Sequence, residues 1–140
     1  MSLEIYRQSL VSAVESVRPS FDALYYPLKV EYDNRETVDL STQSQPYLIV
    51  KVKWNDAYQA DLAAKPIQRI TGHLELISAT KEGDGVARGL IMIDHFYTRL
   101  QQRQFGRVHT HIGDLTPELS KSGWRYQPAL IPFWIHRVTE

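Results

Sequence analysis

A change of hydrophobic period within residues 66–100 constrains the fold of this chain more than any other feature. Apolar and polar residues alternate over Ile67–Leu76, and one face of that stretch carries Ile70, Leu74 and Leu76. Beyond Gly83–Gly85, apolar residues recur at steps of three and four, at Val86, Leu90, Ile93, Tyr97 and Leu100. The sequence therefore predicts a half-buried strand, a glycine turn and an amphipathic helix that ends near Gln104, with Gly106 as its C-terminal cap.

The N-terminal part of the chain has three further periodic segments. A helical stripe starts at Leu3 and includes Leu10 and Val17, and Pro19 is expected to end that helix. Short apolar alternation predicts a strand at Leu28–Tyr32 and a longer one at Tyr47–Trp54. The segment Asn55–Lys65 is interpreted as a long excursion between neighbouring strands.

The C-terminal part is interpreted as strands. Weak alternation predicts a strand at Arg107–Leu115, and Thr116–Gly123 is a turn-rich connection. Trp124–Arg137 alternates clearly, with Ala129, Ile131, Phe133 and Ile135 on one face. Because Pro128 and Pro132 cannot donate ladder hydrogen bonds, this strand is expected at a sheet edge or to carry a bulge.

Together these segments predict one α+β domain that covers residues 1–140. Its elements follow the order helix, strands, helix, strands, and a mostly antiparallel mixed sheet packs against two helices.

Charge and composition exclude several classes of function. Sixteen basic and sixteen acidic residues cancel, so no net field attracts nucleic acid or an anionic membrane. The chain has no cysteine, and so no disulfide, no thiolate nucleophile and no zinc site built on sulfur. The N-terminus lacks a secretory signal pattern, and no apolar run approaches the roughly 20 residues that span a bilayer. A soluble intracellular protein is expected.

Two motifs could carry chemistry. His109 and His111 lie two apart on a predicted strand, so both imidazoles could reach one metal ion, with Asp114 as a possible third ligand. Two solvated histidines are the simpler interpretation, and a small metal-dependent hydrolase is kept as the alternative. Gly83–Gly85 before a helix suggests an anion loop, but a turn that needs positive φ explains both glycines. We therefore predict no catalytic residue, metal or cofactor, and no enzyme.

The order of the elements resembles that of the phage tail terminator-like proteins. The likeness spans nearly the whole chain, and its short motifs are the opening helix, Leu28–Asn34, Pro46–Val52, Thr71–Leu76 with Gly83–Gly85 and the following helix, and Ala129–Ile135. The resemblance implies a non-enzymatic virion tail protein, made in the host cytoplasm. Such a protein forms a homo-oligomeric ring, commonly a hexamer, that caps the tail tube protein and meets the head–tail connector protein. Membranes play no part, and DNA only passes through the lumen. Another neck or connector protein is the close alternative.

A ring built from heterologous contacts needs two different complementary patches on each subunit. Aromatic and arginine residues are enriched in protein contacts, and the polar face of the strand Ile67–Leu76 is expected to line the ring or meet a neighbour. The connections Asn55–Lys65 and Thr116–Gly123 are expected contact loops. The predicted interface residues are Tyr58, Asp61, Arg69, His73, Glu75, Trp124, Arg125 and Tyr126.

Overall fold

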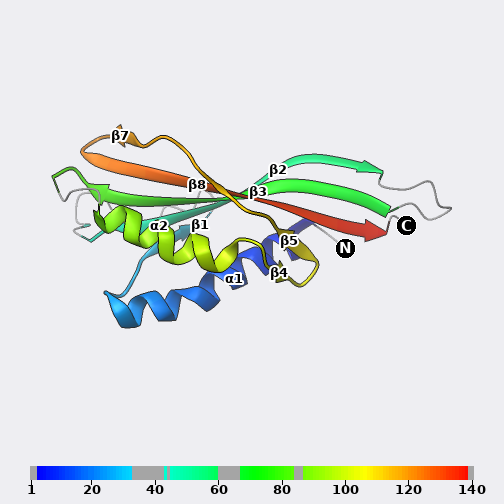
Figure 1. Cartoon of the computed structure of the whole chain (residues 1–140), viewed down its shortest axis with the longest axis horizontal. Coiled ribbons are helices and arrows are strands. Elements are labelled where there is room, and N and C mark those ends of the chain that lie inside the picture. Colours follow the sequence, from blue (N-terminus) through cyan, green and yellow to red (C-terminus); the bar gives the residue numbers. More distant parts are fainter. Residues whose placement is uncertain (1–2, 33–42, 44, 60–66, 84–86, 139–140) are drawn as a thin grey trace.

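The computed structural model describes residues 3–32, 43, 45–59, 67–83 and 87–138 (Figure 1). The fold is α+β, with the predicted order of helix, strands, helix, strands. Its elements are α1 (Leu3–Leu24), β1 (Val30–Tyr32), β2 (Tyr47–Gln59), β3 (Ile67–Lys81), α2 (Ala87–Leu100), β4 (Gln104–Phe105), β5 (Val108–Thr110), β6 (Asp114–Leu115), β7 (Leu119–Lys121) and β8 (Trp124–Val138). Neither helix is long and apolar enough to cross a bilayer, as judged from the described residues.

The strands form one mixed sheet in the order β1-β2-β3-β8-β5-β4, and β6 and β7 also pair with β8. β1 runs parallel to β2, and the other pairs are antiparallel. The long strands β2, β3 and β8 form the middle of the sheet, and both helices lie on the same side of it (Figure 1). One face of the sheet is therefore covered by helices, and we call the other the helix-free face.

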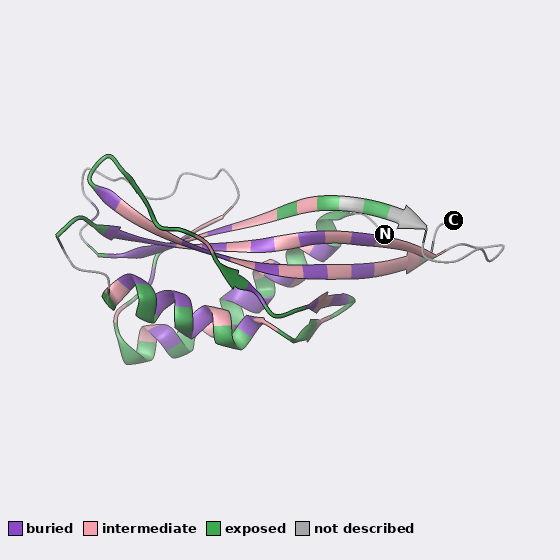
Figure 2. Ribbon diagram, turned by 45° about the horizontal axis from the view of Figure 1, so that its top comes forward, coloured by how far each residue is buried: buried purple, intermediate pink, exposed green. Residues whose placement is uncertain are grey.

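The core lies between the helices and the sheet. Buried and half-buried residues alternate along β3 and β8, as Figure 2 shows, and the buried set has the predicted faces. The core side chains include Ile70, Leu74 and Leu76 of β3, Ala129, Ile131, Phe133 and Ile135 of β8, Tyr6 and Leu10 of α1, and Met92, Ile93, Phe96 and Leu100 of α2.

The buried stripe of α2 differs from the predicted one. Leu90 is 45% exposed, whereas the neighbouring Gly89 is buried. A Cβ atom at Gly89 would lie 3.1 Å from the Ser78 hydroxyl of β3, so the helix comes closest to the sheet at this glycine. Leu90 consequently points away from the sheet. The helix also ends at Leu100 rather than near Gln104.

The prediction that Pro19 ends the first helix is wrong, because α1 continues to Leu24. Pro19 is exposed, so its ring does not disturb the packed side of the helix. Beyond it, Phe21 is buried and packs against Phe96 of α2, with ring centroids 5.9 Å apart. Burial of this aromatic ring offsets the hydrogen bond that the proline removes.

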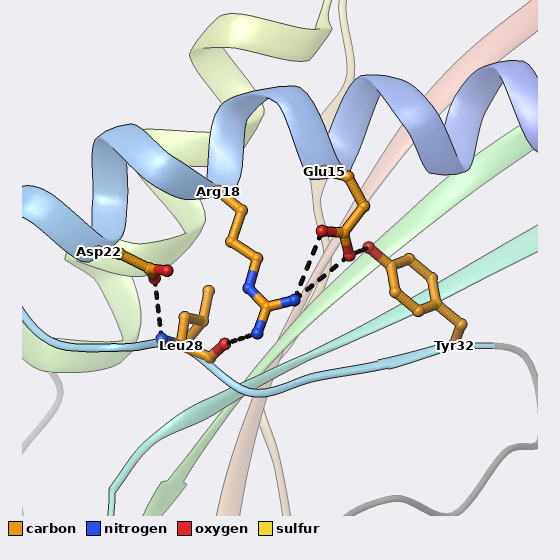
Figure 3. Close-up of polar contacts among 5 residues, drawn as sticks. All are labelled: Glu15, Arg18, Asp22, Leu28 and Tyr32. Atoms are coloured by element: carbon orange, nitrogen blue, oxygen red, sulfur yellow. Dashed lines mark hydrogen bonds and ion pairs between the residues drawn. The ribbon is translucent and has the colours of Figure 1, made fainter.

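Polar contacts fasten the connection between α1 and β1 to the helix (Figure 3). The Leu28 amide donates to the Asp22 carboxylate at 2.8 Å, and the Leu28 carbonyl accepts from the Arg18 guanidinium. Arg18 also forms an ion pair with Glu15 at 3.4 Å, and Glu15 accepts a hydrogen bond from the Tyr32 hydroxyl. These contacts hold β1 at the start of the sheet.

The prediction that the last strand lies at an edge or carries a bulge is wrong. β8 pairs with β3 in one continuous register, and its other side pairs with short strands. The carbonyls of Pro132 and Pro128 accept from the amides of His111 and Thr116 on that other side. Because the N–H and C=O of an antiparallel residue point to the same neighbour, the missing proline donors face the interrupted side. The pairing with β3 therefore loses no donor.

Three connections also differ from expectation. β2 continues to Gln59 with an irregularity between Trp54 and Asp56, so the first part of the expected excursion is strand, and residues 60–65 lie outside the described part. Gly106 has a φ of 61° and forms the turn between β4 and β5 instead of capping α2. The connection 116–123 contains β7, whose residues pair with β8.

Candidate functional site

The helix-free face carries the predicted polar stripe of β3. Strand register places Arg69 opposite His136, Thr71 opposite Trp134, His73 opposite Pro132 and Glu75 opposite Leu130. On the other side of β3, Lys53 of β2 forms an ion pair with Glu75 at 3.4 Å. The predicted interface residues Arg69, His73 and Glu75 thus lie in one row. Apolar side chains of β8, which the sequence pattern did not connect with them, lie next to this row.

Trp134 is the centre of an aromatic and basic group on this face. The His109 ring of β5 stacks on the indole with centroids 4.0 Å apart and planes 4° apart. The Arg69 guanidinium lies over the same indole at 4.6 Å, and the His136 ring lies 4.7 Å away. Three strands therefore contribute to one cluster, which we call the Trp134 cluster: Arg69, His109, Trp134 and His136.

A groove opens beside the Trp134 cluster. Its volume is about 630 Å³, and it lies between the segment 102–104 after α2 and the segment 109–112 around β5. The lining includes the side chains of Gln102, Arg103, Gln104, His109, His111 and Trp134. No local pattern of residues indicates this groove, because it depends on a turn and on the pairing of strands that are far apart in the chain.

The metal-site alternative has two histidines but no third ligand in the part of the chain that is described. His109 is stacked on Trp134, whereas His111 is exposed just after β5 ends. Asp114 lies in β6, opposite Leu130. The described ranges contain no group of three or more His, Cys, Asp or Glu residues placed to hold a metal ion.

The described part of the anion-loop motif is a turn. Gly83 has a φ of 97°, which favours glycine, and it lies two residues after the end of β3. Asp84 and Gly85 lie outside the described residues.

The other predicted interface residues are scattered. Trp124 is only 3% exposed and packs edge-on against Tyr47 at 5.3 Å, which contradicts its placement on an accessible surface. The two rings and Ala79 form a small second core, with Tyr126 packed against it. Arg125 is half-buried and forms an ion pair with Glu118.

The side chains of the last two predicted interface residues lie outside the described part of the chain. Tyr58 is part of β2 and its backbone lies opposite Arg69 in the register. Its side chain is not described, and Asp61 lies outside the described residues.

A buried histidine that pairs with a serine lies on the opposite side of the sheet. His95 of α2 is 5% exposed, and its Nε2 atom lies 2.8 Å from the Ser20 hydroxyl of α1. That hydroxyl donates to the Val17 carbonyl, so its oxygen accepts a hydrogen bond from the imidazole. The serine therefore keeps its proton, and the pair joins the two helices. Asp94, the residue before His95 in the chain, is exposed.

Comparisons with known proteins give the fold and no function. No protein-family model matches the chain, and no curated protein matches it. A solved structure, whose name is only a sequence identifier, is similar over 95% of this chain and 98% of its own, with a TM-score of 0.62 and 15% identity. At that identity the similarity shows a shared fold alone.

Proposed function

We propose that this protein is a structural tail protein of a phage or prophage, a tail terminator that caps the tail tube as a ring and offers a surface to the head–tail connector. The observation that carries the proposal is the helix-free face of the sheet. Both helices pack on the opposite face, so a row of half-buried apolar and charged side chains faces outward along β3 and β8.

The composition of this face suits a protein contact. Leu130, Pro132 and Trp134 alternate along β8 and stay partly exposed. Apolar side chains that stay accessible beside one another are one mark of an interaction site. The neighbouring charges of β2 and β3 give such a contact a register, because like charges placed opposite one another are unfavourable.

The segment that runs beside β8 carries exposed aliphatic side chains on both faces of the sheet. The register places Leu115 opposite Ala129 on the helix side and Leu119 opposite Tyr126 on the helix-free side. Ile112, Leu115 and Leu119 are 62%, 57% and 63% exposed, although large aliphatic side chains are usually buried. A head-to-tail contact needs two different surfaces on one chain. Leu115 on the helix side supports a second surface besides the helix-free face, and such contacts close into a ring when the rotation permits. The order of the elements supports the same proposal through its resemblance to the tail terminators, from which the hexamer and the DNA-filled lumen are taken.

Size measurement and electron microscopy test the proposal together. Purified protein is expected to form rings in analytical ultracentrifugation, and it should cap tail tubes and limit their length when added during tube assembly. A protein that stays monomeric and leaves tube length unchanged would contradict the proposal. Rings that bind a connector but never a tube would instead identify another neck protein.

A further inference from the structure

The groove beside the Trp134 cluster is held in shape by the backbone around it. The Thr110 amide donates to the Arg103 carbonyl at 2.8 Å, and the Thr110 hydroxyl donates to the Leu100 carbonyl at 2.7 Å. The Gln102 amide donates to the His111 carbonyl at 3.3 Å, so both walls are tied together. A groove preorganised in this way loses little entropy when a ligand binds.

Most of the residues that line the groove carry hydrogen-bond donors, and Ile112 and the Trp134 ring form its apolar part. The donors include the Arg103 guanidinium, the carboxamides of Gln102 and Gln104, and the imidazoles of His109 and His111. None of the described residues along its walls is acidic. Arg103 is exposed and makes no ion pair with any acidic residue of the described part, so its charge is available to a ligand.

We propose that this groove binds an acidic segment of a partner polypeptide, with carboxylates received by Arg103 and the neighbouring amide and imidazole donors. Guanidinium and carboxylate form paired, charge-assisted hydrogen bonds, which are stronger than neutral ones. The groove is open to solvent, which suits a segment of a polypeptide better than a small molecule that must be mostly enclosed. This binding site does not depend on the role of a tail terminator, so the proposal goes beyond the function proposed above.

A nucleic acid fits the same donors less well. Binding of single strands relies on bases that stack on free aromatic faces. The Trp134 indole already stacks with His109 and carries the Arg69 guanidinium, so its ring is engaged within the chain. The chain as a whole has no net charge, so no long-range field attracts a polyanion.

Fluorescence anisotropy with a labelled ten-residue glutamate peptide tests the site. The intact protein is expected to bind this peptide saturably, with a dissociation constant below about 1 mM. Arg103→Gln should weaken binding about tenfold, the usual size of one charged hydrogen bond, since the backbone bonds of Arg103 stay in place. Lys121→Gln removes the same charge from an exposed position on β7 and should leave the affinity unchanged.

Three results of the binding experiment would overturn the proposal. They are the lack of saturable binding below about 1 mM, equal weakening by both variants, and tighter binding of a ten-nucleotide oligothymidylate than of the glutamate peptide. A second readout locates the site. In ¹H–¹⁵N spectra the peptide should shift the indole signal of Trp134, assigned with Trp134→Phe, but not that of the buried Trp124. A shift of Trp124 alone would also reject this groove.

Discussion

The imidazole of His109 lies parallel to the indole of Trp134, with ring centroids 4.0 Å apart. The two residues come from neighbouring strands, β5 and β8, and face each other directly in the register. β5 has only three residues, and it is also held by pairing with β8 and β4 and by the buried Val108 and Thr110. The stacked pair therefore adds to the contacts that hold this wall of the groove.

His109→Ala is expected to lower the free energy of unfolding by about 1 kcal/mol, the usual contribution of a stacked ring pair. Urea unfolding followed by circular dichroism measures it. His111→Ala is the matched control, because this exposed histidine should change stability by less than about 0.5 kcal/mol. Equal losses in the two variants would show that the stack contributes nothing of its own.

Glu75→Arg is expected to disturb assembly and leave the fold intact. The carboxylate pairs with Lys53. The Lys53 side chain is 49% exposed and the Glu75 side chain 14%, so removal of this partly buried pair should cost about 1 to 2 kcal/mol. Two cations would then face each other on the proposed contact surface, and sedimentation should show smaller species at a given concentration.

Two variants control the Glu75→Arg experiment. Glu82→Arg makes the same charge change at an exposed position after β3 and should assemble normally. Lys53→Glu combined with Glu75→Lys restores an ion pair and should restore part of the assembly. Unchanged assembly in Glu75→Arg would remove the support that this face gives to the proposed function.

Local patterns predicted the parts of the fold that depend on local burial. The alternation in β3 and β8 identified the buried faces, because each strand has one side against the helices. The same alternation placed Arg69, His73 and Glu75 together on the outer side.

Local hydrophobic patterns do not predict which distant strands pair with one another. Trp134 and His109 meet because β5 returns beside β8, and Trp124 is buried in the small second core with Tyr47 and Ala79. The sequence pattern marked Trp124 as polar-facing and said nothing of what lies over that face.

Pro19 shows how tertiary packing can outweigh a local rule. A proline inside a helix removes a backbone hydrogen bond and crowds the preceding turn, at a cost of about 3 kcal/mol. α1 nevertheless continues, since Phe21 beyond the proline is buried in the core. The helix therefore contains a residue that lowers its stability, and contacts with residues far along the chain offset this loss of free energy.

Pro19→Ala is accordingly expected to raise the free energy of unfolding by about 1 to 3 kcal/mol. Thermal and urea unfolding measure the gain. Pro27→Ala provides the comparison, because Pro27 lies in the connection after the helix and its loss should only free the unfolded chain, at a cost below about 1 kcal/mol. Lower stability in Pro19→Ala would mean that the proline suits its place in α1.

The buried His95 is expected to make stability depend on pH. It packs edge-on against Phe21 at 5.4 Å and against Phe96 at 5.7 Å. Burial lowers the pKa of His95 below its ordinary value of 6.5, and the nearby Arg99 lowers it further, while Asp94 acts weakly in the opposite direction. The folded protein therefore binds the proton less tightly than the unfolded chain.

The sign of the effect follows from that difference. Stability from neutral His95 is fully present above pH 6.5 and is lost as the pH falls from there toward the lowered pKa, by up to about 1.4 kcal/mol per pH unit. His95→Gln keeps a donor for Ser20 and cannot gain a charge. Urea unfolding at about pH 7.5, 6.5 and 5.5 should show the wild type losing more stability than His95→Gln as the pH falls. Because the two proteins differ only at residue 95, parallel profiles would show that His95 does not cause the acid sensitivity.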